Sequence, residues 1–304
     1  MKVLITGGNG FGGVGLGRNL EKRGHDVTIL DIISPNASYL VDLIDAGRIK
    51  YIWKATHDIQ PKDIEGQDVV CNFAAQADVP MGHVSPIWTG LENVMGTIPV
   101  LEAVRKVGVW KFIQPSTGNV YGRPIYLPID EKHPLTPHNP YSASKVAQEM
   151  YVWAYSRCYG IPVIIFRNGI VYGPGMRRDI FLYIWIKNLL QGKPIIIEGG
   201  KQTRDPCYAT DTVDVWTAGV ESKDPAIIGE SFQVSKGDEY TVEDIAGKLL
   251  NRLPGSVKYT RYRPGEEGQR ECFNINKAKI MLGYNPKIDL DSGIQLLIGD
   301  MKNG

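Results

Sequence analysis

Short apolar runs alternate with longer amphipathic stretches through the first half of the chain. Residues 3–5 predict a short buried strand, and residues 11–22 predict the helix that follows it. Further buried strands are predicted at 25–30, 68–73 and 162–167. Strands that alternate with helices in this way form a parallel sheet covered on both faces. The pattern therefore predicts an α/β fold with a doubly wound parallel sheet.

Three further helices are predicted, at residues 39–46, 87–107 and 141–159. The last of them begins after Pro140 and is followed by Gly160, which suits a helix start and a helix end. Beyond residue 175, glycine and proline interrupt the pattern. We therefore expect a sheet domain over residues 1–175 and a smaller, loop-rich α/β part over 176–304. Segments of the second part could cross back to the first domain.

The composition is that of an ordinary globular protein, with 43% hydrophobic and 22% charged residues. A net charge of +1 gives no bulk attraction to nucleic acid or to an anionic membrane. The four cysteines lack metal-ligand spacing, and the apolar segment 181–190 is too short for a bilayer and suits core packing. The chain enters a strand at once, which argues against a secretory signal. We expect a cytoplasmic protein without a metal, a membrane or a nucleic acid partner.

The turn after the first strand has the sequence TGGNGFGG. Glycines 7, 10 and 13 would let the backbone turn sharply, approach a pyrophosphate and pack the helix against the strand. The phosphates would then lie on N–H groups at the helix start, near Phe11 and Gly12. Glycines also serve plain turns, so this motif alone is weak evidence for a dinucleotide site.

An acidic residue follows the second strand. Asp31 lies about 20 positions after the glycines, where a carboxylate would hold the 2′-hydroxyl of the adenosine ribose. The same carboxylate would repel a 2′-phosphate, and residues 32–34 supply no arginine to accept one. We therefore expect NAD rather than NADP as the cofactor. The alternative is a surface aspartate that merely ends a strand.

A tyrosine and a lysine stand four residues apart at the start of the helix over 141–159. Tyr141 and Lys145 project from one helix face, and an ammonium near a phenol favours the phenolate. Such a tyrosine can act as an acid–base group near neutral pH. Ser116 and Thr117 end a strand at the sheet edge where ligands bind, so one hydroxyl could contact the same substrate oxygen. The alternatives are that Tyr141 and Lys145 are only a pair on the helix surface, and that Ser116 and Thr117 only satisfy hydrogen bonds of a turn.

In their order along the chain, these segments resemble the extended short-chain dehydrogenase/reductases. The resemblance is to the NAD-dependent epimerase/dehydratase group that acts on nucleotide sugars. It rests on TGGNGFGG, NFAAQADV, LENVMGTIPVLEAVRK, STGNVYG, NPYSASK and FRNGIVYGPG. The segments GGKQTRDPCYATD and RYRPGEE resemble the C-terminal substrate part of the family. The match runs through essentially the whole chain and implies a Rossmann-type fold.

The resemblance implies a role for each matching residue. Tyr141 is the acid–base residue, and Lys145 lowers its pKa and binds the nicotinamide ribose. Thr117 is preferred over Ser116 as the catalytic hydroxyl, and Ser116 lines the cofactor. The other implied cofactor residues are Gly7, Gly10, Phe11, Gly12, Gly13, Asp31, Asp58, Ala74 and Ala75.

Three residues are implied on the substrate side. Asn168 follows a core strand, and Arg204 and Arg263 match arginines that clamp the nucleotide diphosphate. Arginine suits this task because its forked donors are charged. A solvated, salt-bridged surface is the alternative for both arginines.

The residues after Thr117 bear on the reaction. Related dehydratases and decarboxylases carry carboxylates there, as in S-T-D-E-V-Y-G, whereas this chain has Gly118 and Asn119. Without a second acid–base pair, the loss of water across C5–C6 lacks proton carriers. The sequence therefore favours epimerisation of a nucleotide sugar at C4, most simply a UDP-hexose or UDP-hexuronate, through a 4-keto intermediate. The alternatives are an oxidoreductase, decarboxylase or dehydratase of the same family, and an NAD-sensing protein without catalysis.

Some positions depart from the family pattern. Ile170 replaces an asparagine that contacts substrate in the family, and Gly82 replaces a serine. The acidic residue that reads the adenine edge is not unique, because Thr56 aligns while Asp58 lies nearby. These departures point to a specialised sugar. The resemblance also implies a homodimer, formed by the helix near residues 87–107 and the helix that carries Tyr141.

Overall fold

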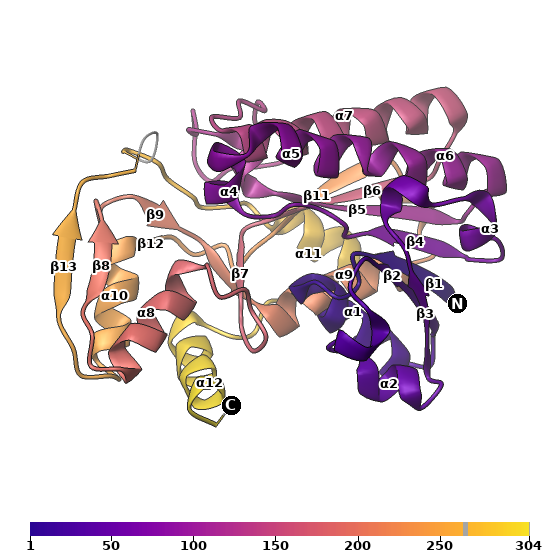
Figure 1. Cartoon of the computed structure of the whole chain (residues 1–304). Coiled ribbons are helices and arrows are strands. Elements are labelled where there is room, and N and C mark those ends of the chain that lie inside the picture. The colour runs from indigo at the N-terminus through magenta and orange to yellow at the C-terminus, as the bar shows by residue number, and fades with distance from the viewer. Residues whose placement is uncertain (264–266, 304) are drawn as a thin grey trace.

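A seven-stranded parallel sheet forms the centre of the computed structural model, which describes residues 1–263 and 267–303 (Figure 1). The strand order is β11-β6-β5-β4-β1-β2-β3, so the chain reverses direction across the sheet between β1 and β4. These strands are β1 (Lys2–Thr6), β2 (Asp26–Asp31), β3 (Ile49–Trp53), β4 (Val69–Asn72), β5 (Lys111–Thr117), β6 (Val163–Asn168) and β11 (Glu230–Val234). The predicted doubly wound parallel sheet is confirmed.

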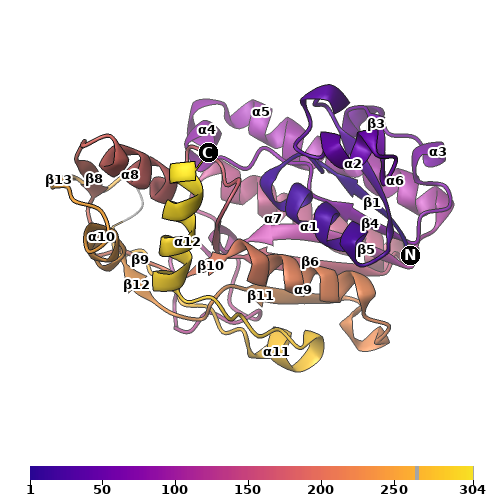
Figure 2. The same cartoon turned by 90° about the horizontal axis from the view of Figure 1, so that it is seen from below.

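Helices cover both faces of this sheet because alternate strand residues point to opposite sides. Val3 and Ile5 of β1 pack in the core beneath one layer of helices, and Leu4 packs in the core beneath the other. The first layer, seen from below in Figure 2, contains α1 (Phe11–Lys22), α2 (Val41–Asp45), α9 (Ala209–Glu221) and α11 (Asn276–Leu282). The second contains α3 (Pro61–Ile64), α6 (Thr97–Val107) and α7 (Pro140–Tyr159).

The segment 87–107, predicted as one helix, is interrupted in the structure. It is built from α5 (Pro86–Gly90), a π-helical turn η3 (Leu91–Met95) and α6, preceded by α4 (Val79–Val84). Asn93 in the wide turn accepts the Gln76 N–H at 2.7 Å and donates to Ser144 Oγ at 2.8 Å. The predicted helix over 87–107 is therefore present but contains a π turn, in which the Gly96 N–H donates to the Leu91 carbonyl oxygen at 2.9 Å.

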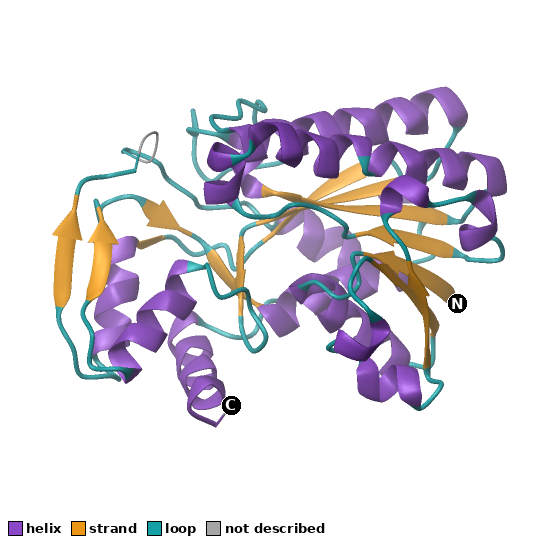
Figure 3. Ribbon diagram, in the orientation of Figure 1, coloured by secondary structure: helices purple, strands orange, loops and turns teal. Residues whose placement is uncertain are grey.

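A smaller lobe lies beside the sheet and has its own apolar core (Figure 3, left). Its helix α8 (Phe181–Leu190) buries Leu182, Trp185 and Ile186, so the predicted core packing of this segment is confirmed. The other elements of this part are β7 (Ile170–Tyr172), β8 (Ile195–Glu198), β9 (Thr203–Arg204), β10 (Pro206–Tyr208), β12 (Tyr240–Thr241), β13 (Val257–Thr260), α10 (Val242–Leu250) and α12 (Leu290–Asn303). Between these elements the chain crosses back to add α9 and β11 to the first sheet.

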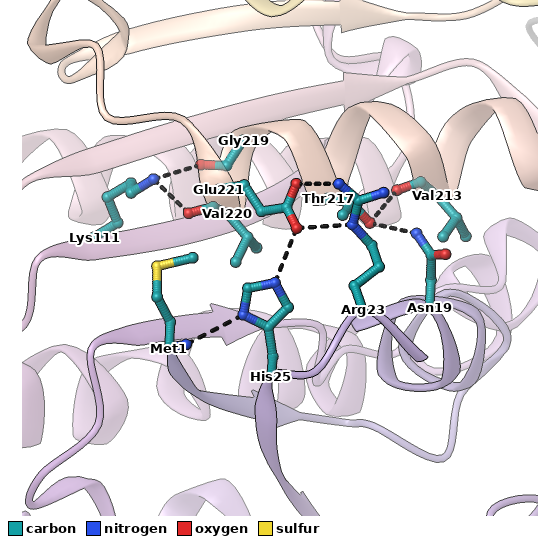
Figure 4. A network of polar contacts seen from close by, with 10 residues as sticks. All are labelled: Met1, Asn19, Arg23, His25, Lys111, Val213, Thr217, Gly219, Val220 and Glu221. Atoms are coloured by element: carbon teal, nitrogen blue, oxygen red, sulfur yellow. Dashed lines mark hydrogen bonds and ion pairs between the residues drawn. The ribbon is translucent and has the colours of Figure 1, made fainter. Parts of the chain in front are cut away.

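Polar contacts fasten α9 to the amino end of the sheet (Figure 4). Glu221 at the end of α9 accepts hydrogen bonds from Arg23 at 2.6 and 2.7 Å and lies 2.9 Å from His25 Nε2. The N-terminal ammonium of Met1 lies 3.3 Å from His25 Nδ1. Lys111 of β5 donates to three carbonyl oxygens at the C-terminal end of α9, which satisfies groups that a helix leaves unpaired. These contacts of Glu221 and Lys111 lie at the amino ends of the strands, whereas the glycine turn follows the carboxyl end of β1.

Short helical turns complete the chain: η1 (Pro35–Ala37), η2 (Thr56–Asp58), η4 (Gly118–Tyr121) and η5 (Pro225–Ile227). Within residues 1–263 and 267–303, none of the helices combines the length and the apolar character that a bilayer crossing requires.

Candidate active site

The glycine turn lies at the carboxyl end of β1, where the strand order reverses. Gly7 has φ +61°, and a Cβ there would lie 2.5 Å from the backbone of Ala74. A Cβ at Gly13 would lie 2.6 Å from the Gly7 carbonyl oxygen. Both positions therefore need glycine, since any side chain would collide with the backbone. The result is a tight turn with Ala74 directly beside it.

The start of α1 is shaped to receive an anion. Gly10 precedes the helix and supplies no side-chain cap, so the first N–H groups face outward without one. Phe11 packs its ring against the core of the smaller lobe. A Cβ at Gly12 would lie 2.9 Å from Phe73 and 3.0 Å from Trp216, so the helix start sits close to both neighbours. These features fit a dinucleotide pyrophosphate.

Asp31 is not a free surface carboxylate. Its oxygens accept the N–H of Asn9 at 2.9 Å and the N–H of Ile33 at 3.0 Å, and the residue is 7% exposed. These bonds hold the carboxylate between the glycine turn and the loop after β2, where a ribose hydroxyl would reach it. Asp58 is exposed at the end of η2, while Thr56 in the same turn is buried. Asp58 and the exposed Ala75 remain predictions as cofactor contacts.

Two of the predicted catalytic residues, Tyr141 and Thr117, lie close to each other. Tyr141 lies in the first turn of α7, which Asn139 caps by accepting the Ser142 N–H at 2.8 Å. Its hydroxyl interacts with the side chain of Thr117 at the end of β5. Burial raises the pKa of Tyr141, while the positive charge of Arg177 and the bond with Thr117 act in the opposite direction. The two hydroxyl groups can therefore share one substrate oxygen.

Sequence reasoning missed Arg177. It lies in the loop between β7 and α8 and pairs with Asp179 at 2.9 Å. In the folded chain the charge of Arg177 acts on Tyr141 of α7, and the run Met176-Arg177-Arg178-Asp179 after a glycine-rich turn was a visible signal of charge. A cation beside the phenol favours its ionised form.

Lys145 is buried one turn after Tyr141 and faces polar atoms. Its Nζ donates to the Pro115 carbonyl oxygen at 2.9 Å and to Gln148 Oε1. Burial lowers the pKa of Lys145 to about 8, while the carboxylate of Glu149 acts in the opposite direction. The lowering of the Tyr141 pKa by Lys145 stays a prediction. Burial raises that pKa, and Arg177 is the charge that acts against the shift.

The two neighbouring hydroxyls on β5 have different surroundings. Ser116 Oγ donates to Glu149 Oε1 at 2.5 Å, and Glu149 forms a buried ion pair with Arg167 at 2.7 Å. The proton of Ser116 is therefore committed to Glu149, whereas the hydroxyl of Thr117 reaches Tyr141. This difference supports the choice of Thr117 as the catalytic hydroxyl.

The predicted substrate residues are engaged within the protein. Asn168 Nδ2 donates to the Ser116 carbonyl oxygen at 3.0 Å, and its Oδ1 accepts from Trp216 at 3.1 Å. Arg204 Nη1 lies 3.8 Å from a Glu271 oxygen and donates to Thr203 O at 2.8 Å. The half-exposed Arg263 pairs with Glu198. Their contact with substrate stays a prediction.

A buried phenol, a threonine hydroxyl and a buried lysine meet at the sheet edge beside a dinucleotide turn, as in the NAD-dependent short-chain dehydrogenase/reductases. Residues 3–235 match the model of the NAD dependent epimerase/dehydratase family, and the chain belongs to this family. The predicted resemblance and the NAD dependence are thereby confirmed.

Relatives in the family carry out more than one reaction. The chain is 31% identical to UDP-glucose 4-epimerase of Mycolicibacterium smegmatis, over 100% of this chain and 99% of that protein. It is 30% identical to human dTDP-D-glucose 4,6-dehydratase, over 98% of this chain and 89% of that protein. The crystal structure of UDP-glucuronic acid 4-epimerase from Bacillus cereus, in complex with UDP-glucuronic acid and NAD, superposes with a TM-score of 0.92. Its identity is 28%, with 100% of this chain and 99% of that chain covered.

Proposed function

We propose that the protein is an NAD-dependent 4-epimerase of a nucleotide sugar. The observation that carries this proposal is the environment of Gly118, the residue after the catalytic threonine. A Cβ at Gly118 would overlap the ring of Phe273, which is 2% exposed. A carboxylate in the place that family dehydratases use has no room here, and Asn119 next to it is neutral. The site therefore supplies one acid–base group, which is enough for epimerisation and too little for loss of water.

The chain's own residues account for the proton movements. Tyr141 takes the proton of the C4 hydroxyl and later returns it, while Thr117 keeps that oxygen in place by a hydrogen bond. Arg177 favours the ionised phenol that starts the reaction. Asp31, the glycine turn and Lys145 would hold NAD, which when bound supplies reversible hydride transfer at C4. Rotation of the 4-keto sugar between the two transfers gives the C4 epimer.

The substrate class is the finer part of the proposal. A UDP-hexose or a UDP-hexuronate is supported by the nucleotide sugars that the similar epimerases act on. Arg204 and Arg263 would bind the diphosphate, for which charged, forked donors are suited. A cytoplasmic location agrees with four cysteines that form no disulfide in the described chain.

Dehydration is the second candidate, because the human relative is a dTDP-glucose 4,6-dehydratase at nearly the same identity as the epimerase. The experiment incubates the purified protein with UDP-glucose, UDP-glucuronate, UDP-N-acetylglucosamine and their dTDP, CDP and GDP counterparts. Proton NMR follows the anomeric signals while the NADH absorbance is recorded. A new C4 epimer without accumulating NADH is expected. A 4-keto-6-deoxy or unsaturated product assigns a dehydratase, and NADH with carbon dioxide assigns an oxidative decarboxylase. Bound NAD without turnover of any sugar assigns an NAD sensor.

We also propose a homodimer formed through the helices around α7. Apolar side chains are exposed along α4, α5 and the π turn, all of which contact α7. Val84 and Ile87 are each 79% exposed. The others on this face are Met81, Trp88, Leu91, Met95 and Met150. Several exposed apolar side chains on neighbouring helices are typical of a protein interface, and a second copy of the chain would cover them.

A further inference from the structure

Gln148 lies on α7 three residues after Lys145, so the two side chains share one helix face. The residue is fully buried. Its Oε1 accepts a hydrogen bond from the Lys145 ammonium, whose other partner is the Pro115 carbonyl oxygen at 2.9 Å. An uncharged amide thus supplies half of the hydrogen bonds of the buried ammonium.

The orientation of this amide is determined by its other end. Gln148 Nε2 donates to the Asn93 carbonyl oxygen at 3.0 Å and to Thr97 Oγ1 at 2.6 Å. The Thr97 hydroxyl donates its proton to the Asn93 carbonyl oxygen at 2.8 Å, so it can only accept a hydrogen bond from Gln148. A flipped amide would set its NH₂ group against the ammonium and its oxygen against two acceptors. The carbonyl oxygen therefore has to face Lys145.

The same hydrogen bonds reach the dinucleotide turn. Asn72 at the end of β4 donates to Thr97 Oγ1 at 3.1 Å and accepts from Thr6 Oγ1 at 2.6 Å. Thr6 ends β1, directly before the glycine turn. Buried polar chains in which every partner is satisfied hold their members rigidly. Gln148 thus couples Lys145 to the part of the sheet that carries the pyrophosphate turn.

We propose that Gln148 is a positioning residue for Lys145, which holds the ammonium toward the nicotinamide ribose site and favours its charged form. An ammonium has three N–H groups, and the two protein acceptors leave one to donate to the cofactor. The turnover part of this inference rests on the proposed epimerase function. The part that concerns NAD binding does not depend on the identity of the sugar.

The charge of Lys145 depends on few groups. Burial lowers its pKa to about 8, and Glu149 is the charge that opposes this shift. Glu149 is itself shared with Arg167 of β6. Tyr141 lies one turn before Lys145 on α7, whereas α6 and the π turn contribute the uncharged Thr97 and Asn93. Removal of the amide oxygen takes away a stabilising partner that no neighbouring charge replaces.

The experiment compares Gln148→Met with Gln202→Met in the full-length protein. Gln202 is a buried glutamine of the smaller lobe whose amide also bonds at both ends, to Gly200 N–H and Glu198 O. NAD affinity is measured by calorimetric titration between pH 6.5 and 9.5. We expect Gln148→Met to bind NAD about tenfold more weakly at pH 7.5, the effect of one hydrogen bond to a charged group. The pH at which binding weakens should fall by about one unit. Gln202→Met should match the wild type in both respects.

Gln148→Glu keeps an oxygen toward Lys145, and its second oxygen, when protonated, can donate to the Asn93 carbonyl oxygen, so this variant should keep a pH limit close to that of the wild type. A loss of stability alone would not lower the limit in one of these variants and spare it in the other. If Gln148→Met does not fold, Gln148→Glu and Thr97→Val decide, and Thr97→Val should weaken NAD binding in the direction of Gln148→Met. The proposal is overturned if a folded Gln148→Met or Thr97→Val keeps the wild-type affinity and pH limit. Failure to epimerise any sugar would leave the NAD result standing and would overturn only the proposed function.

Discussion

At the scale of single residues, chemistry at this site depends on which hydroxyl and which cation lie beside Tyr141. Burial raises the pKa of Tyr141, so burial alone would keep this phenol protonated and unable to accept a proton. Thr117 and Arg177 act against that shift, and they come from β5 and from the loop before α8. Residues far apart in the chain thus set the proton affinity of one group.

Replacement of Tyr141 by phenylalanine should remove turnover and leave the cofactor bound. The change deletes the proton acceptor and keeps the ring, so we expect the rate to fall by roughly 10²–10⁴. Proton NMR measures the rate on whichever nucleotide sugar the wild-type protein converts, and calorimetry measures NAD affinity. Turnover close to that of the wild type would remove Tyr141 from the mechanism.

Replacement of Gly118 by aspartate should destabilise the protein and should not create a dehydratase. The new side chain overlaps the Phe273 ring, and overpacking of this kind costs about 1–3 kcal/mol. Urea unfolding measures the loss. In a double-mutant cycle, Gly118→Asp should cost less in the Phe273→Ala background than in the wild type, because the ring that it overlaps is gone. Unchanged stability of the single variant would show that the space beside Gly118 is open.

At the scale of elements, the carboxyl end of the sheet holds the site and the amino end holds the helices in place. Glu221 of α9 bonds to Arg23 and His25, which lie just before β2. Lys111 satisfies the carbonyl groups at the end of the same helix. Since α9 packs directly on α1, this contact supports the helix whose first turn would bind the pyrophosphate.

Replacement of Glu221 by glutamine should lower stability in a pH-dependent way. The hydrogen bond from Arg23 holds the pKa of Glu221 below its usual value, so the folded form binds a proton less tightly than the unfolded form. The contribution, roughly 0.5–1 kcal/mol, is full above the ordinary carboxyl pKa and is lost as pH falls through the folded-state pKa. Urea unfolding between pH 7 and about 2.5 should show a constant gap from the wild type above the ordinary carboxyl pKa and a closing gap below it. The control Glu65→Gln, at the exposed end of α3, should show no gap.

At the scale of the whole molecule, two cores meet across the site. The parallel sheet carries the glycine turn, Thr117 and Tyr141, and the smaller lobe carries Arg204 and Arg263. Phe11 links them, because it begins α1 and packs in the core of the smaller lobe. The same architecture leaves an apolar face on the helices around α7.

Replacement of Ile87 by glutamate should convert a dimer into a monomer, because it buries a charge in the proposed interface. Light scattering after gel filtration should give twice the mass of one chain for the wild type and the mass of one chain for the variant. Ile280→Glu is the matched control, since Ile280 is 83% exposed on α11, away from this face. A monomeric wild type at micromolar concentration would contradict the proposed dimer.

Much of this protein was predictable because its signals are local. The predicted helix 11–22 agrees with α1, and the predicted helix 141–159 agrees with α7 within one residue. Hydrophobic period, proline and glycine punctuation and the motif order are all properties of neighbouring residues. The π turn within the predicted helix 87–107 was not predictable from local pattern, and its Asn93 bonds to Gln76 and Ser144, which lie elsewhere in the chain.

The sequence by itself determined the sheet, the dinucleotide turn, the family and the pairing of Tyr141 with Lys145 on one helix face. Only the tertiary structure decided which partners these groups meet. It assigned the ammonium of Lys145 to Gln148 and Pro115, and it placed the positive charge of Arg177 where it acts on the phenol. It also filled the space beside Gly118 with Phe273. The physical reason is that spacing along a helix or strand follows from covalent geometry, whereas contacts between distant segments arise only when the chain packs.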